Sequence, residues 1–337
     1  MNILFKGLLT GLLAIAATTS EAQPQKGLHV INAFHIASAG GWDYLAIGPK
    51  NDWLYVSHGT QVNIINKKNG DSVGVIENTT GVHGIAFDIN NGRGYTSNGR
   101  INTVTVFDLN NNKVLSQIAT GQNPDAIMYE PFSKKIITCN GRSKNLTIID
   151  PVSNQAVDSV FIGGKVETAV TDGAGKLFVN VEDKNEIVVV DTKTFKVLNH
   201  WSIAPGEAPT GLSIDLQTKR LFVGCEKLLI VMDATNGKIV DKLPIGEGCY
   251  GTAFDPTTKN IFTSNGEGTL TVVHEDNADK YTLIENAVTK KGARTLALDY
   301  ATHLIYLPTA EFEPMAAGEK GRPKMIPGSF QVLVMGK

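Results

Sequence analysis

Residues 94–121 read GYTSNGRINTVTVFDLNNNKVLSQIATG, and residues 221–246 read LFVGCEKLLIVMDATNGKIVDKLPIG. Each stretch contains an apolar strand, a polar turn, a second strand that ends in Asp, another turn and a last strand. Short runs of β-branched and aromatic residues bounded by Gly, Asn and Asp are typical of β-strands joined by tight turns. A similar unit recurs along the chain, which indicates a repeat protein.

Two sets of equivalent residues measure the repeat. The third strand of successive units ends at positions separated by 42, 42, 41, 42 and 42 residues, namely Asn66, Asp108, Asp150, Asp191, Asp233 and Glu275. The second strand carries one large apolar residue per unit at intervals of 40 to 44, namely Tyr55, Tyr95, Ile137, Phe178, Phe222, Phe262 and Tyr306. The chain therefore has seven units of about 42 residues.

A unit of this length holds four strands, and one four-stranded sheet cannot bury both of its faces alone. The sequence therefore predicts an all-β, seven-bladed β-propeller with four-stranded blades. The seventh unit ends after its third strand, Phe330–Met335. An unassigned strand, Leu28–Ile36, would complete blade seven and close the ring, which removes exposed sheet edges.

The N-terminus is typical of a signal peptide. A short apolar run, Leu8–Ala17, precedes a small-residue cleavage signal that ends at Ala22. We expect residues 1–22 to be removed and residues 23–337 to form a single domain that is periplasmic or secreted. No later segment is long and apolar enough to span a bilayer.

The formal net charge is −2 and the chain has no block of basic residues, which argues against binding to nucleic acid or anionic lipid. Nothing in the sequence requires a second copy, so we expect a monomer. Of the three cysteines, Cys225 and Cys249 are expected on the same face of neighbouring blades. They could form a disulfide in an oxidising compartment or remain as buried thiols.

Two rings of residues are expected at the face of the propeller where the inner strands begin. The first comprises Asp43, His83, Asp125, Glu167, Thr210, Tyr250 and Arg294, and the second comprises His58, Asn98, Asn140, Val181, Cys225, Asn265 and Thr309. Glu182, Glu226 and Glu267 follow the second ring by one or two residues. Polar residues also line propeller channels simply because water fills them. As a set, however, these residues predict a ligand site at the channel mouth.

The residue types at this site are compatible with more than one kind of chemistry. His58 and His83, with Asp43 and Asn98, could hold a divalent cation. The sequence contains no zinc-protease, EF-hand or nucleophile-elbow motif, so it requires no cofactor and favours a binding protein over an enzyme.

One segment departs from the repeat. Residues 311–328 in blade seven contain three Pro and three Gly and predict an irregular loop over the channel mouth. Lys320, Arg322 and Lys324 would bring positive charge there. The segment is interpreted either as a lid or partner-binding loop or as a disordered insertion.

The two quoted stretches resemble the YVTN-type propeller repeat of the YncE-like family, and the resemblance extends from about residue 40 to residue 337. It implies a β-propeller fold and export. Most members of the family have no assigned reaction, and some are described as DNA-binding. More distant look-alikes include lactonases and the haem d1 domain of nitrite reductase.

Three functions follow as hypotheses. The first is an exported module that binds a small ligand or a partner protein at the channel face. The second is a metal-dependent, lactonase-like hydrolase that uses Asp125, Asn140, Glu167 and Glu182. The third, implied by the resemblance alone, is single-stranded DNA binding, with Trp42, Tyr44 and Tyr250 as stacking aromatics.

Overall fold

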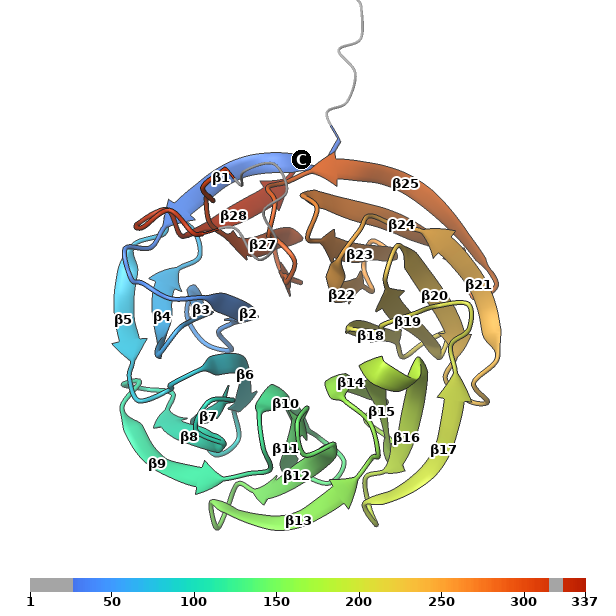
Figure 1. The fold of residues 1–337 in the computed structure, drawn as a ribbon, viewed down its shortest axis with the longest axis horizontal. Helices are drawn as coiled ribbons and strands as arrows, with labels where there is room; N and C mark the ends of the chain where they lie inside the picture. Colours follow the sequence, from blue (N-terminus) through green and yellow to red (C-terminus); the bar gives the residue numbers. More distant parts are fainter. Residues whose placement is uncertain (1–26, 315–323) are drawn as a thin grey trace, which may run out of the picture.

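The computed structural model of the chain describes residues 27–314 and 324–337. Seven four-stranded antiparallel sheets form a ring around a central channel (Figure 1). The chain is therefore a seven-bladed β-propeller, as the repeat predicts. The expected signal peptide, residues 1–22, lies outside the described residues.

The strands occupy equivalent places in each blade. The inner strands are β2 (Trp42–Ile47), β6 (Val82–Asp88), β10 (Pro124–Glu130), β14 (Val166–Thr171), β18 (Gly211–Asp215), β22 (Cys249–Asp255) and β26 (Ala297–Asp299). The second strands are β3 (Trp53–His58), β7 (Arg93–Asn98), β11 (Lys135–Asn140), β15 (Lys176–Val181), β19 (Arg220–Cys225), β23 (Asn260–Asn265) and β27 (Leu304–Thr309).

The outer half of each blade follows the same order. The third strands are β4 (Gln61–Asn66), β8 (Thr103–Asp108), β12 (Asn145–Asp150), β16 (Glu186–Asp191), β20 (Leu228–Asp233), β24 (Thr269–Asn277) and β28 (Gln331–Gly336). The outermost strands are β5 (Ser72–Ile76), β9 (Val114–Ala119), β13 (Gln155–Phe161), β17 (Lys196–Ser202), β21 (Ile239–Pro244), β25 (Lys280–Val288) and β1 (His29–His35). A single turn of 3₁₀ helix, η1 (Glu182–Lys184), follows β15.

The hydrophobic core is divided among the seven blade interfaces. Each of the seven clusters of buried apolar side chains joins two adjacent blades. The large second-strand residues that measure the repeat are all buried in these clusters. Burial of apolar area is the main stabilising contribution to folding, so the blades stabilise one another rather than folding independently.

The N-terminal strand closes the ring as the sequence predicts. β1 pairs antiparallel with β28, and the blade-seven sheet runs in the order β1–β28–β27–β26. Phe34 and Ile36 on this segment belong to the core cluster between blades seven and one. A buried ion pair crosses the same interface, with Lys67 Nζ 2.7 Å from Asp299 Oδ2. Tyr306 donates a hydrogen bond from its hydroxyl to the Lys67 carbonyl at 3.0 Å.

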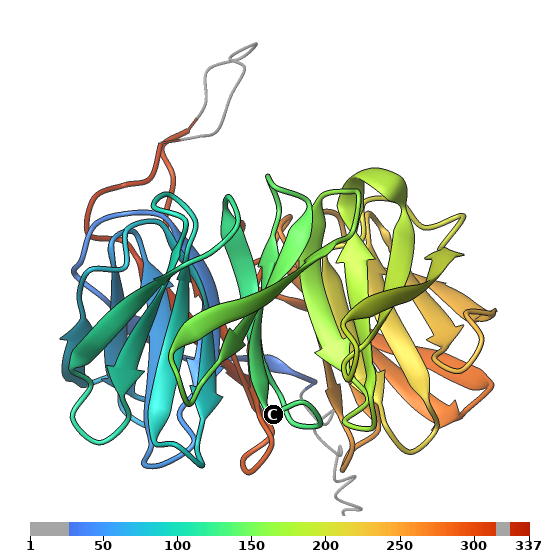
Figure 2. The same ribbon diagram turned by 90° about the horizontal axis from the view of Figure 1, so that it is seen from below.

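The blade-seven insertion begins and ends as a short paired stem rather than as an irregular loop. Phe312 and Met325 form a β-bridge, and the Glu313 amide donates to the Lys324 carbonyl at 2.8 Å. The ring of Trp42 packs 5.9 Å from that of Phe312, which gives the stem an apolar contact with blade one. The stem rises from one face of the ring (Figure 2). Lys320 and Arg322 lie outside the described residues.

Within residues 27–314 and 324–337, no helix has the length and apolar character needed to cross a bilayer.

Candidate functional site

The first predicted ring gathers at the mouth of the channel, on the face where the inner strands begin. Asp43, His83, Asp125 and Glu167 are each the second residue of their inner strand, in β2, β6, β10 and β14. Tyr250 holds the same place in β22, whereas Thr210 and Arg294 precede β18 and β26. Equivalent positions in the seven blades thus bring these residues to one face of the ring.

Hydroxyl groups from neighbouring strands hold this part of the backbone in place. Thr295 Oγ1 donates to the Asp43 carbonyl at 2.6 Å, and Ser97 Oγ donates to the Asp125 carbonyl. Ser264 Oγ donates to the Arg294 carbonyl at 2.5 Å. Because these hydrogen bonds are buried or partly buried and cross between blades, the side chains of the first ring start from a rigid frame.

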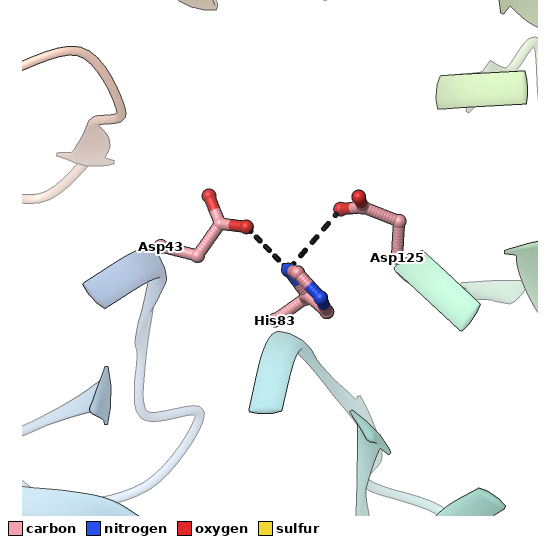
Figure 3. A group of neighbouring side chains, drawn as sticks. All are labelled: Asp43, His83 and Asp125. Carbon is pink, nitrogen blue, oxygen red and sulfur yellow. Dashed lines mark hydrogen bonds and ion pairs between the residues drawn. The ribbon is translucent and has the colours of Figure 1, made fainter. Parts of the chain in front are cut away.

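Asp43, His83 and Asp125 form a compact triad drawn from blades one, two and three (Figure 3). His83 Nδ1 lies 2.6 Å from Asp43 Oδ2 and 3.8 Å from Asp125 Oδ1. The two carboxylates are almost fully buried, with 6% and 9% of their side chains exposed, whereas His83 is 27% exposed. The imidazole of His83 is therefore the part of the triad that is most exposed to the channel.

The protonation of His83 and of Asp125 depends on the charges of the other residues in the triad. Burial disfavours the charged imidazole, but the hydrogen bond to Asp43 and the charges of Asp125, Asp43 and Glu167 outweigh it and raise the pKa of His83 to about 9. Burial is also the largest influence on Asp125. Although the positive His83 opposes it, the pKa of Asp125 rises to about 7. The carboxyl of Asp125 is therefore harder to ionise than an exposed aspartate, and the imidazole of His83 is easier to protonate than an exposed histidine.

A second polar cluster adjoins the triad on the side of blades four and six. Lys165 Nζ lies 2.6 Å from Glu167 Oε1 and also contacts Glu182. The Tyr250 hydroxyl donates to Glu167 Oε2 at 3.1 Å. Burial and the charge of Asp125 raise the pKa of Glu167 to about 8 even though Lys165 opposes the shift. Sequence reasoning missed Lys165, which stands two residues before Glu167 at the entry to β14.

A cavity of about 720 Å³ opens on the same face across blades four to seven and blade one. Trp42, Phe312 and Met325 supply its apolar wall, together with the ring of Tyr250. Its charged lining residues are Glu182, Glu226, Lys291 and Arg294. Phe312, Met325 and Lys291 were not named as site residues, although residues 311–328 were predicted to lie over the channel mouth.

Arg294 is held over the face of Tyr250, with its guanidinium carbon 5.0 Å from the ring centroid. Its Nε is buried and has no hydrogen-bond partner. Among the described residues Arg294 forms no salt bridge. Because the side chain lines the cavity, its terminal N–H groups rather than the buried Nε are the donors that a ligand there could reach.

The second predicted ring ends the second strands as expected, but it does not line the channel mouth. His58, Asn98, Asn140 and Asn265 are completely buried. Asn140 Nδ2 donates to Thr147 Oγ1 on β12 at 2.8 Å, and Thr138 Oγ1 donates to Asn140 Oδ1 at 2.9 Å. Asn98 and Asn265 make the equivalent hydrogen bonds to β8 and β24. These three asparagines therefore join second strands to third strands, and their amides are not available to a ligand.

His58 is likewise structural. Its two ring nitrogens are hydrogen-bonded to Ser38 Oγ at 2.6 Å and to the Gly40 carbonyl at 2.8 Å. Its ring stacks on Phe330 with centroids 3.9 Å apart. The cation site predicted from His58, His83, Asp43 and Asn98 is therefore wrong in two members, and Asp125 is the residue that completes the cluster instead.

The three cysteines are buried free thiols. Cys225 on β19 and Cys249 on β22 do come from neighbouring blades, as predicted, but the disulfide is not formed. Burial raises the pKa of Cys249 to about 12 and that of Cys225 still further above its usual range.

Comparisons with known proteins bear on the fold alone. No family model and no curated protein matches the chain. Among solved structures, a chain of Kuenenia stuttgartiensis hydrazine synthase is similar, with a TM-score of 0.69 and 16% sequence identity over 81% of this chain and 94% of that chain. At this identity the similarity supports the propeller architecture and carries no activity over.

Proposed function

We propose that this chain is an exported, YncE-like propeller that binds a small zwitterionic organic molecule, of the amino-acid type, in the channel-face cavity. The observation that carries the proposal is the guanidinium of Arg294, which has no salt-bridge partner among the described residues and lines a cavity with an apolar wall of Trp42, Phe312 and Met325. Ligand sites typically combine such apolar walls with a few converging polar groups in volumes of about 300–1,000 Å³.

The charges of the cavity are separated. Lys291 and Arg294 come from blade seven, whereas Glu182 follows blade-four strand β15 and Glu226 follows blade-five strand β19. A ligand carboxylate would pair with Arg294, which offers a planar fork of donors. A ligand ammonium would face Glu226, since Glu182 is already paired with Lys165. Trp42 and Phe312 would cover an apolar side chain.

Thermal stabilisation of the full chain by a panel of amino acids, monocarboxylates and amines tests this proposal, because a bound ligand raises the melting temperature by mass action. We expect stabilisation by one group of zwitterions and weaker effects from the matching carboxylates and amines. Stabilisation by amines alone, or by no compound at millimolar concentration, would refute the proposal.

Two glycine substitutions provide a matched pair of variants. A Cβ at Gly41, which lines the cavity, meets no atom within 4 Å, and the same holds for Gly74 on the outer strand β5. Gly41→Phe should fill the cavity and abolish the ligand-induced shift, whereas Gly74→Phe should leave it unchanged. Equal ligand responses in the two variants would place the binding site elsewhere.

The other hypotheses receive less support. The four residues assigned to a hydrolase include Asn140, whose amide is already engaged by Thr147 and Asn145. Single-stranded DNA would bring phosphates toward Glu182, Glu226 and the acidic triad, which opposes binding. Steeply salt-dependent DNA binding would revive the third hypothesis.

Export is tested separately. We expect the protein isolated from its source to begin at Gln23 and to be recovered from the periplasm or the medium. Intact mass and cell fractionation measure both, and a cytosolic protein that retains residues 1–22 would contradict this part of the proposal.

A further inference from the structure

We infer that Asp43, His83 and Asp125 form a binding site for a first-row divalent transition-metal ion, such as Zn²⁺ or Mn²⁺, on the channel axis. This site is distinct from the cavity that takes the organic ligand and does not depend on it. It uses side chains from three consecutive blades, which a single repeat could not bring together.

The geometry suits three metal ligands. One atom from each of the three residues lies within 4.8 Å of the other two. For metal–ligand bonds of about 2.0–2.2 Å, ligand atoms in a tetrahedral site are about 3.4 Å apart. The distances of 2.6 and 3.8 Å from His83 Nδ1 to the two carboxylates lie on either side of that value. Small side-chain rotations on the fixed backbone would therefore make the site regular.

The hydrogen bonding of the carboxylates points to a missing partner. Asp125 Oδ1 is buried, and the Asp125 side chain accepts no hydrogen bond within residues 27–314 and 324–337. Asp43 Oδ1 is also buried and unpartnered. Figure 3 shows Asp125 directed toward His83 from the side opposite Asp43. Buried carboxylate oxygens are normally satisfied, so the unsatisfied Asp125 Oδ1, 3.8 Å from His83 Nδ1, calls for a positive partner that the imidazole can share.

Electrostatics favours the same conclusion. Asp43, Asp125 and Glu167 are all nearly buried and interact with one another. A divalent cation at His83 would offset the repulsion between these carboxylates, because its charge is larger than that of the imidazolium proton it replaces.

The ligand types identify the class of metal. An imidazole with two carboxylates suits Zn²⁺, Mn²⁺ or a related ion, whereas Ca²⁺ requires six to eight oxygen ligands. The partial exposure of His83 leaves room for water to complete the coordination. We therefore expect Zn²⁺ and Mn²⁺ to bind and Ca²⁺ and Mg²⁺ to bind far more weakly.

The protein contains an internal comparison. His303 Nδ1 also lies 2.6 Å from a buried aspartate, Asp255 Oδ2. Asp255 is already hydrogen-bonded by the amides of Thr257 and Thr258, and among the described residues the channel triad is the single group of this kind. The His303–Asp255 pair therefore controls for any metal affinity of a simple His–Asp pair.

Isothermal titration of the tag-free, chelator-stripped full chain with ZnCl₂, MnCl₂, CaCl₂ and MgCl₂ tests the inference. We expect one equivalent of Zn²⁺ or Mn²⁺ per chain. Asp125→Asn and His83→Asn should each weaken that binding by at least about tenfold, and His303→Asn should bind like the unmodified chain. Circular dichroism of each variant verifies that it is folded.

A measurement on the unmodified chain removes any dependence on variant folding. Paramagnetic Mn²⁺ should broaden the ring resonances of His83 at substoichiometric amounts and spare those of His303. Absence of stoichiometric binding by the unmodified chain would show that the triad is only an imidazolium bridging two carboxylates. Full affinity in folded His83→Asn, or broadening of other histidines first, would overturn the assignment.

Discussion

Replacing Phe34 by alanine tests whether β1 closes the ring energetically as well as geometrically. Phe34 is 4% exposed and belongs to the cluster between blades seven and one. Its ring lies over Gly70, where an added Cβ would come within 2.5 Å of it. Truncating a buried Phe to Ala costs about 3–5 kcal/mol, because apolar burial is lost and a cavity remains.

In a chain of this size each kcal/mol shifts the melting temperature by about 2 °C, so Phe34→Ala should melt about 6–10 °C below the unmodified chain. Phe161→Ala is the matched control. Phe161 also lies on an outermost strand, β13, but is 72% exposed. Its substitution should change the free energy of unfolding by no more than about 0.5 kcal/mol.

Scanning calorimetry and equilibrium urea unfolding would measure both variants. Because every core cluster joins two blades, the loss should appear in one transition of the whole domain, and deletion of residues 28–36 should produce a larger loss of the same kind. The reasoning is refuted if Phe34→Ala is no less stable than Phe161→Ala. It is also refuted if Phe34→Ala shows a small unfolding transition that precedes an unchanged main transition, since blade seven would then unfold alone.

Three further outcomes are expected. Lys67→Met should destabilise the ring by about 3–5 kcal/mol at pH 7, because Asp299 is left buried without its cation. In the unmodified chain burial opposes ionisation of Asp299, but the hydrogen bonds from Lys67 and Thr302 prevail and lower its pKa. This stabilisation is therefore present above the unfolded pKa of about 3.9 and is lost as pH falls through the folded pKa. The difference in the free energy of unfolding between the unmodified chain and Lys67→Met should then shrink in acid. A difference that stays constant from pH 7 to pH 3 would contradict this prediction. Asn140→Ala should cost about 1–3 kcal/mol in urea unfolding while leaving ligand binding unchanged, and a stability equal to that of the unmodified chain would show that its hairpin contacts are dispensable. A thiol reagent should label none of the three buried cysteines in the folded chain and all of them in denaturant, whereas rapid labelling of the folded chain would contradict their burial.

The fold was predictable because the same packing arrangement between adjacent blades recurs seven times. Each second strand must bury one large side chain between two blades, so Tyr55, Phe178 and Tyr306 recur at nearly constant intervals. The ends of the strands followed from the turn residues, with small differences such as Glu275, which lies inside β24 rather than at its end. Because the pattern recurs seven times, strand and turn signals that are weak in one unit together predict the whole fold.

The asparagines of the second ring show where the same reasoning failed. They stand at the correct face of the ring, but position along a strand does not say to which side a side chain points. A signal was nevertheless present in the sequence. TSNGRINTVT (96–105), TCNGRSKNLT (138–147) and TSNGEGTLT (263–271) each place Thr two residues before Asn and Thr again on the facing strand. This spacing matches an amide that accepts from one threonine and donates to another across a hairpin.

The channel mouth differs from the rest of the repeat for a physical reason. Where a repeat position packs between blades, its chemistry stays nearly constant around the ring, because every interface has the same shape. Where it reaches the channel, the backbone is fixed by its neighbours' hydroxyl groups and the side chain is free to vary. Acidic groups therefore gather on blades one to four, at Asp43, Asp125 and Glu167, without loss of blade packing, while Arg294 faces them from blade seven. An asymmetric site on a symmetric frame would let the proposed cation and the proposed organic ligand occupy different sides of one channel.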